Sequence, residues 1–222
     1  MMKYPLLFLN LKSLFKQAKF YVIFLKLLMI LPIVSYGHDI LRQKCVDIDA
    51  SYPELDILIN NMWETMEGAD GCGLAAPQVN VPVRLFIVDS KDTFDRMDFH
   101  ERREYFEGDE GIRETFINAK ITGRSTNVWT DKEGCLSIPS MSEDVERPWS
   151  ITIEYSDRKF QVQKRTFKGV TARMIQHEYD HTEGILYLDY LPAFKRTLLL
   201  KKKLKNISQG QVKSKYKMKF LQ

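Results

Sequence analysis

The stretch QHEYDH, residues 176–181, places the pattern H-E-x-x-H inside a segment with the residue spacing of an α-helix. Residues four positions apart lie above one another on a helix, so His177 and His181 can direct two imidazole rings at one metal ion. Glu178 is rotated by about 100° from His177. Its carboxylate is therefore badly placed to be a third ligand, but it can reach a water bound at an open coordination position of the metal. Sites of this kind use the metal to activate the water and the carboxylate to move its proton. Because two histidines and a glutamate also occur in structural helices, the pattern needs support from the rest of the chain.

The helix that carries this pattern is expected over 170–182, and Gly184 ends it. A β-hairpin is predicted just before it. Segments 151–155 and 160–167 alternate polar and apolar residues, and the polar turn 156–159 joins them.

Farther upstream, the pattern predicts one more helix and two strands. Apolar residues recur at helical spacing over 55–66, with Ser51 as the predicted N-cap and Gly68 at the end. Segments 83–89 and 115–122 are rich in β-branched and aromatic residues, which predicts strands.

Three segments are less regular. Charged residues dominate 90–114, which predicts a solvated loop or short helix, and 185–190 is expected to be a short extended piece. A last helix is expected to begin near Pro192. No repeat or linker interrupts residues 33–190, so a single domain is predicted.

The composition is that of a globular protein, but its charge is uneven. The chain has 222 residues, 44% of them hydrophobic and 28% charged, which is enough for one sizeable core. Its net charge of +4 comes from the two ends, which carry lysine and arginine but no acidic residue. We therefore divide the chain into an N-terminal extension (1–28), a central domain that contains the H-E-x-x-H pattern (29–195) and a lysine-rich C-terminal tail (196–222).

The cysteines and the N-terminal segment bear on location. Three cysteines without disulfide spacing indicate a reducing compartment, and we expect a cytoplasmic protein. The apolar run 20–34 is interrupted by Lys26 and Pro32 and is too short to span a bilayer comfortably. For residues 1–28, a signal or transit peptide, a membrane-surface helix, and an extension upstream of a translation start at Met29 all remain open. A targeting role would make the protein organellar or bound at a membrane surface.

Two compact motifs precede the H-E-x-x-H helix. DGCGLAAPQ (70–78) contains small residues that let another backbone or a peptide-like ligand approach closely, although a plain tight turn would have the same composition. EGCLSIP (133–139) is the second motif, and it contains Cys135.

A catalytic zinc-type centre needs a third protein ligand besides the two histidines. The metzincin pattern would place a histidine six residues after His181, but that residue is Tyr187. A downstream glutamate of the thermolysin type is also missing, because no acid follows Asp189. The third ligand is therefore expected upstream, and Cys135 is the best candidate because thiolate and imidazole both suit Zn²⁺ and Fe²⁺.

The motifs GCGLAAPQ (71–78), EGCLSIP (133–139) and QHEYDH (176–181), in this order, resemble those of peptide deformylases. The resemblance implies an α+β fold in which antiparallel sheets pack around a central helix bearing H-E-x-x-H, with a C-terminal helix. It also implies an enzyme that removes the N-formyl group from N-formylmethionyl nascent peptides and releases formate. One divalent metal is implied, typically Fe²⁺, with Zn²⁺, Ni²⁺ or Co²⁺ as substitutes.

The resemblance also implies roles for residues at matching positions. Glu178 would be the general acid/base, and the side-chain amide of Gln78 and the backbone N–H of Leu136 would donate to the substrate oxyanion. The implied metal ligands are Cys135, His177 and His181.

Other positions concern the substrate. The resemblance implies that the backbone of Gly71 and Gly73 meets the peptide. Arg173 and Met174 are candidates to line the methionine pocket, and a place in the core suits Met174 equally well. Arg147 is predicted to pair with Asp70 and so to tie two of the motifs together. Some relatives have an arginine seven residues beyond the metal cysteine, where this chain has Ser142.

Two other functions compete with deformylation. A metallopeptidase that cuts internal peptide bonds shares H-E-x-x-H but would not explain Cys135 or the Gln78 motif. A non-catalytic relative bound to the ribosome or a membrane would be expected to lack a ligand or Glu178. Two interpretations of the basic tail 196–222 remain open: it binds ribosomal RNA, or it is a solvated tail. Contact of residues 1–28 with a membrane also remains open.

Overall fold

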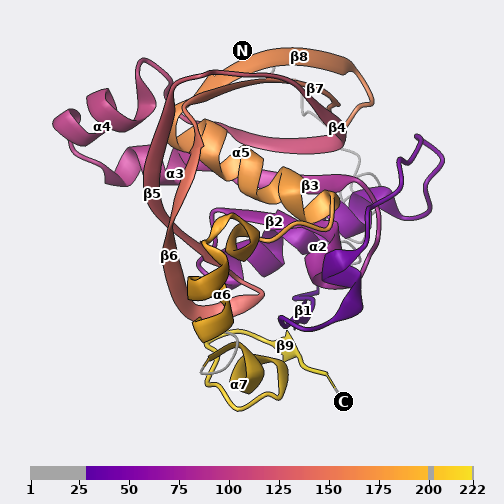
Figure 1. Cartoon of the computed structure of the whole chain (residues 1–222). Helices are drawn as coiled ribbons and strands as arrows, with labels where there is room; N and C mark the ends of the chain where they lie inside the picture. Colours follow the sequence, from indigo (N-terminus) through magenta and orange to yellow (C-terminus); the bar gives the residue numbers. More distant parts are fainter. Residues whose placement is uncertain (1–28, 200–202, 222) are drawn as a thin grey trace, which may run out of the picture.

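The computed structural model describes residues 29–199 and 203–221 (Figure 1). The expectations for residues 1–28 lie outside these ranges. In the part of the chain that is described, no helix has both the length and the apolar character needed to cross a membrane.

A five-stranded antiparallel sheet forms the centre of the molecule. Its strand order is β2-β3-β4-β7-β8, which leaves β2 and β8 at the edges. The predicted hairpin is confirmed, since Ser156 of β7 pairs with Val162 of β8 across the turn. The strands are β2 (Gly73–Ala75), β3 (Leu85–Asp89), β4 (Arg113–Arg124), β7 (Ser150–Ser156) and β8 (Val162–Lys168).

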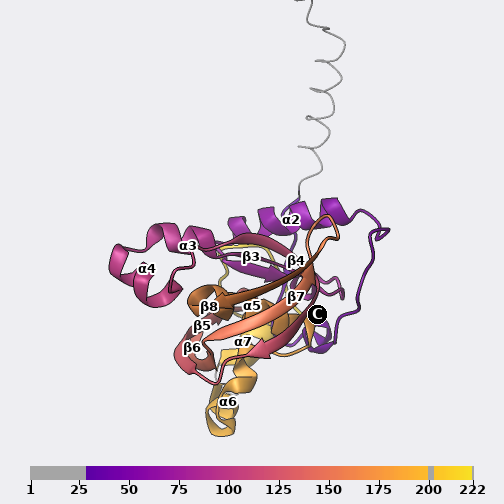
Figure 2. The same cartoon turned by 90° about the horizontal axis from the view of Figure 1, so that it is seen from above.

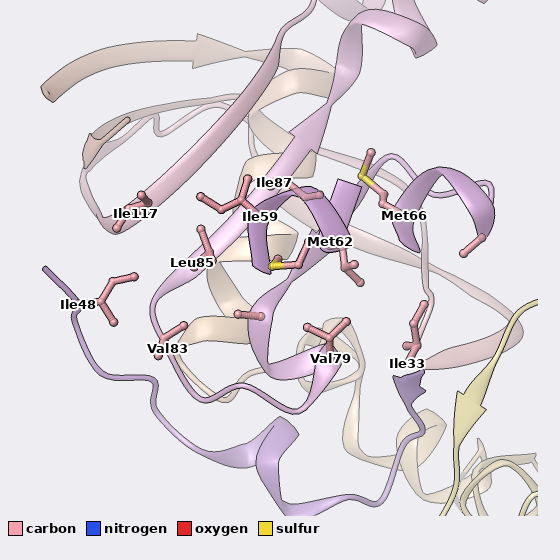
Figure 3. Packing of buried hydrophobic residues seen from close by; sticks show 13 residues of the cluster. Ile33, Ile48, Ile59, Met62, Met66, Val79, Val83, Leu85, Ile87 and Ile117 are labelled. Atoms are coloured by element: carbon pink, nitrogen blue, oxygen red, sulfur yellow. The ribbon is translucent and has the colours of Figure 1, made fainter. Parts of the chain in front are cut away.

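Two helices of 14 residues, α2 (Leu55–Gly68) and α5 (Gly169–Thr182), cover opposite faces of this sheet (Figure 2). The alternation of side chains along β3 explains the arrangement. Leu85 and Ile87 pack with Ile59, Met62 and Met66 of α2 (Figure 3), whereas Phe86 and Val88 pack with Ala172 and Ile175 of α5. The H-E-x-x-H helix is thus held against the buried inner face of the sheet, and its bounds agree with the sequence prediction.

A long two-stranded ribbon crosses beside α5 (Figure 1). It consists of β5 (Val128–Cys135) and β6 (Ile138–Pro148), joined by a turn at Leu136 and Ser137. Cys135 pairs with Ile138, with a register shift after Gly134, so the turn residues lie outside the regular ladder. The ribbon therefore brings the EGCLSIP motif to the C-terminal half of α5.

The two ends of the described chain meet beneath the ribbon. Strand β1 (Ile33–Val34) pairs in parallel with β9 (Met218–Lys219). A buried apolar cluster joins residues of this region to β6 and to the segment after α5, among them Val34, Ile138, Tyr187, Leu204 and Ile207. The remaining elements here are η1 (Asp39–Arg42), η3 (Tyr187–Tyr190), α6 (Ala193–Leu199) and α7 (Lys205–Ser208).

The structure corrects some predicted details. The N-cap of α2 is Glu54 in a left-handed conformation with no side-chain cap, so the prediction of Ser51 was wrong. Residues 187–190 form the 3₁₀ helix η3 and not an extended piece. The charged segment 90–114 contains two short helices, α3 (Ser90–Arg96) and α4 (Phe99–Phe106). Their N-caps are aspartates, Asp89 and Asp98, whose carboxylates accept backbone N–H groups of the first turn.

Candidate active site

Three side chains of the metal-ligand type converge where the ribbon meets α5. Cys135 is the last residue of β5, and His177 and His181 lie four apart on α5. The Sγ atom of Cys135 is 3.2 Å from Nε2 of His181, and the nearest ligand atoms of all three residues lie within 4.8 Å of one another. Among the described residues, this is the one group of such side chains that could hold a metal ion. One thiolate and two imidazoles suit a divalent cation of the zinc or iron type.

Glu133 orients one of these rings. Its Oε2 lies 3.1 Å from Nδ1 of His177, which leaves the other ring nitrogen, Nε2, free to face Cys135 and His181. Burial alone would lower the pKa of His177, but the hydrogen bonds with Cys135 and Glu133 outweigh it and raise that pKa well above its usual range. The carboxylate therefore fixes the direction of the ring.

A buried ion network lies behind the ligands. Arg147 donates to both oxygens of Glu133, at 2.6 and 2.8 Å, and to Oδ2 of Asp180 at 2.6 Å. Asp180 also accepts the hydroxyl of Tyr190 at 2.9 Å. Burial would raise the pKa of Glu133, but the hydrogen bonds from Arg147 and His177 reverse the effect and hold it well below its usual range. Glu133 is therefore an ionised anchor that links β5, β6 and α5.

This network corrects one sequence expectation. Arg147 does not pair with Asp70; it pairs with Glu133 and Asp180. Asp70 is exposed, and the guanidinium of Arg96 lies 4.0 Å from it. No role was predicted from the sequence for Glu133 or Asp180, because neither residue type nor spacing marks them as partners of an arginine. Each nevertheless lies within two residues of a predicted metal ligand.

Glu178 lies against Gly73 of the edge strand β2. It is buried, and within the described part of the chain its Oε2 has no hydrogen-bond partner. A Cβ atom on Gly73 would lie 2.5 Å from Oε1 of Glu178 and 2.7 Å from its Cγ, so only glycine leaves room for this side chain. Burial raises the pKa of Glu178 to about 7. Such a carboxyl can hold or release a proton near neutral pH.

Gln78 faces the same cluster from η2 (Ala76–Val79). Its Oε1 accepts the N–H of Ala75 at 2.8 Å, which turns the amide nitrogen toward the turn of the ribbon. Nε2 lies 3.3 Å from Oγ of Ser137 and 3.5 Å from Sγ of Cys135. The amide nitrogen of Gln78 therefore faces Cys135 and the turn, and its role as a donor to the substrate stays a prediction.

The site opens into one large cleft of about 950 Å³. Nearly all the predicted site residues line it: Gly71, Gly73, Gln78, Cys135, Leu136, Arg173, His177 and Glu178. His181 lies beneath them and is almost fully buried. Met174 and the exposed Cys72 also line the cleft.

Arg173 uses its guanidinium for structure. It donates to Oε1 of Glu133 at 2.6 Å and to the carbonyl oxygens of Val145 and Trp129 at 3.0 and 2.9 Å. The guanidinium also lies over the ring of Trp129. Most of the guanidinium is thus engaged by β5 and β6, although Arg173 also lines the cleft.

Comparisons with known proteins agree with this site. The family model described as polypeptide deformylase matches residues 30–197. A peptide deformylase of Christiangramia forsetii is 48% identical over 192 residues, which cover 86% of this chain and 96% of that protein. A peptide deformylase of Flavobacterium psychrophilum is 47% identical over 193 residues, covering 87% and 98%.

Solved structures give the same result for the fold. The peptide deformylase of Ehrlichia chaffeensis superposes with a TM-score of 0.71 at 30% identity, over 83% of this chain and all of that one. A class I type b peptide deformylase of Acinetobacter baumannii, bound to Met-Ala-Ser, superposes with a TM-score of 0.63 at 28% identity, over 74% and 99%. The chain is therefore a member of the peptide deformylase family, with the expected α+β fold around the H-E-x-x-H helix.

Proposed function

We propose that this deformylase removes the formyl group from N-formylmethionyl nascent peptides through the cleft described above, with Glu178 moving the proton. The observation that carries the proposal is the convergence of Cys135, His177 and His181 beside a buried carboxylate with an unpartnered oxygen. A metallopeptidase or a non-catalytic relative would share parts of this site, but neither explains the family match and the complete residue set together.

Cys135, His177 and His181 would hold one divalent cation, which we propose is Fe²⁺, with Zn²⁺, Ni²⁺ or Co²⁺ as substitutes. Their donor atoms and spacing fit such an ion, and Glu133 already holds the His177 ring in the direction that a ligand needs. When bound, the ion supplies Lewis acidity and lowers the pKa of a water molecule toward neutrality.

Glu178 is proposed as the general acid/base. Its Oε2 has no partner among the described residues, so it can accept a proton from the attacking water and later deliver it to the departing amine nitrogen. The raised pKa favours both steps, because the carboxyl holds the proton at little cost near pH 7.

Two donors are proposed for the oxygen of the formyl group as it becomes negative. They are the Nε2 group of Gln78, whose direction is set by Ala75, and the backbone N–H of Leu136. One such donor typically contributes about 3–4 kcal/mol to transition-state stability. A formyl carbon bears only hydrogen, so a narrow site between these donors can admit it and exclude larger acyl groups.

The peptide itself is proposed to lie along β2. This strand is an edge of the sheet, and Gly71 and Gly73 place no side chain between its backbone and the cleft. An extended peptide can therefore add to the edge by main-chain hydrogen bonds. Met174, with the stem of Arg173, is proposed to line the pocket for the methionine side chain.

We also propose a cytoplasmic location and a ribosome contact through residues 196–222, as an enzyme acting on nascent chains would need. The exposed lysines at 213, 215, 217 and 219 support an interaction with RNA phosphates. Ribosome co-sedimentation that persists after these four lysines are changed to glutamine would contradict the contact. The predicted membrane contact of residues 1–28 lies outside the residues that the structure describes.

The test of the main proposal is an anaerobic assay of formate release from formyl-Met-Ala-Ser, with metal content measured on the same sample. We expect Glu178→Gln to keep the metal and lose most of the activity, because the amide cannot accept the proton. Wild-type turnover by that variant would contradict the role of Glu178. Cleavage of internal peptide bonds without formate release would contradict deformylation itself.

A further inference from the structure

The C-terminal segment 211–221 does not follow the pattern of a solvated tail. Its side chains alternate between half-buried and exposed, with the lysines exposed and Val212, Ser214, Tyr216, Met218 and Phe220 turned inward. This period of two is that of an extended strand with one face on the protein. The inward face reaches the active-site cleft, because Tyr216 is one of the residues that line it.

We propose that Tyr216 is a positioning residue of the active site, which holds the turn at Leu136 and Ser137 so that its backbone can serve the reaction. The hydroxyl of Tyr216 donates to the carbonyl oxygen of Leu136 at 2.8 Å. The ring packs on the apolar cluster formed by α2 and β3, and Leu136 packs on the same cluster. The proposal rests on the proposed function, in which the Leu136 backbone stabilises the oxyanion.

The turn needs such support because it lies outside the ladder of the ribbon. Cys135 pairs with Ile138, so the carbonyl groups of Leu136 and Ser137 have no partners of the regular β5–β6 type. Each carbonyl instead accepts a hydrogen bond from a distant segment. Leu136 is bound by the Tyr216 hydroxyl at 2.8 Å, and Ser137 by the backbone N–H of Tyr36 at 2.8 Å. The side chain of Ser137 also lies 3.3 Å from the Gln78 amide.

The two segments that hold the turn are themselves joined. Ile33 donates to the carbonyl of Lys217 and Ser35 to that of Lys219, both at 2.9 Å, in the parallel pairing of β1 with β9. The first of these bonds lies next to Tyr216. The position of the Tyr216 ring is therefore fixed by backbone hydrogen bonds and not only by its own packing. Oxyanion donors act through fixed geometry, so a residue that fixes their backbone affects the rate without touching the substrate.

Tyr216→Phe removes the hydroxyl and keeps the ring, so it tests the hydrogen bond alone. We expect kcat and kcat/KM for a formyl-Met peptide to fall by the same factor, about three- to tenfold, the range of one net hydrogen bond, with KM unchanged. Metal content should stay at the wild-type value, and Tm should fall by only about 1–6 °C. Backbone amide exchange of peptic fragments spanning 136–137, followed by mass spectrometry, should become faster.

Tyr52→Phe is the matched control. Tyr52 packs on the same apolar cluster, is half-buried, and makes no side-chain hydrogen bond within the described residues. This variant should leave both kcat and amide exchange unchanged. Wild-type kcat in Tyr216→Phe, a slower enzyme with unchanged exchange at 136–137, or an equal loss in Tyr52→Phe would overturn the proposal. If the wild-type protein releases no formate, the proposed function fails, whereas amide exchange still reports whether Tyr216 holds the turn.

Discussion

Gly73→Ala is the most direct test of how the fold positions the catalytic carboxylate. The added Cβ would lie 2.5, 2.7 and 2.8 Å from Oε1, Cγ and Cδ of Glu178, distances at which one group has to move. The backbone of β2 is paired with β3, and α5 is packed on the sheet, so the Glu178 side chain is the part that can yield. An off-rotamer side chain costs about 0.5–1.5 kcal/mol, and overpacking of a filled site costs about 1–3 kcal/mol.

The functional loss should exceed the loss of stability. A displacement of about 1 Å at a catalytic group can lower the rate by about a hundredfold. We therefore expect kcat for formate release to fall by about that factor, with a free energy of unfolding lower by about 1–3 kcal/mol in urea titration. Metal content should be retained, because Glu178 is not in the ligand cluster.

Gly123→Ala is the control for the chemical change. Gly123 lies in β4 of the same sheet, and a Cβ there would be 3.5 Å from the nearest atom, which belongs to Thr152. This variant should keep wild-type kcat and metal content. A Gly73→Ala enzyme with wild-type kcat would refute the reasoning, since it would mean that the position of Glu178 against β2 does not matter for the reaction.

Two further predictions concern the centre itself. Arg147→Met leaves Asp180 buried without a cation and Glu133 with Arg173 alone, and it should lower the free energy of unfolding by about 3–5 kcal/mol in urea. Arg158→Met, which breaks the exposed pair with Asp56, should cost at most about 1 kcal/mol. Equal losses in the two variants would contradict the anchoring role of Arg147. Cys135→Ser should lower the amount of bound metal, because a hydroxyl is a poorer ligand than a thiolate. It should also reduce the rise in Tm that added Zn²⁺ produces, since an ion present at a thousand times its Kd adds about 4 kcal/mol to the free energy of unfolding. Cys72→Ser, at an exposed cleft position outside the ligand cluster, should keep the wild-type metal content and the wild-type rise in Tm. Loss of metal in Cys72→Ser but not in Cys135→Ser would contradict the assignment of Cys135 as the ligand.

The sequence predicted the ligand cluster because its members carry local patterns. The spacing of His177 and His181 encodes their common face, and Cys135 lies in a motif of its own. The network behind them has no such pattern. Arg147 could have paired with any buried carboxylate, and sequence alone offers no reason to choose Glu133 and Asp180 over Asp70. The choice depends on the path of β6 past α5, which is a property of the fold.

The C-terminal segment shows a different kind of miss. Its lysines suggested a ribosomal RNA contact or a solvated tail, and the alternation of Val212, Tyr216 and Phe220 with charged residues was not used. The period of two was present in the sequence and could have been recognised. The helix η3 was harder to predict, because a short apolar segment such as 185–190 fits an extended piece and a single helical turn equally well.

The parallel pairing of β1 with β9 has a consequence for biosynthesis. Ile33 and Val34 are translated long before Met218 and Lys219, the residues that complete their sheet. Tyr216 arrives with strand β9, so its hydrogen bond to the turn at Leu136 can form only after that part of the chain has been translated. A deformylase that acts on other newly made chains thus needs a segment translated well after its own active-site turn to hold that turn in place.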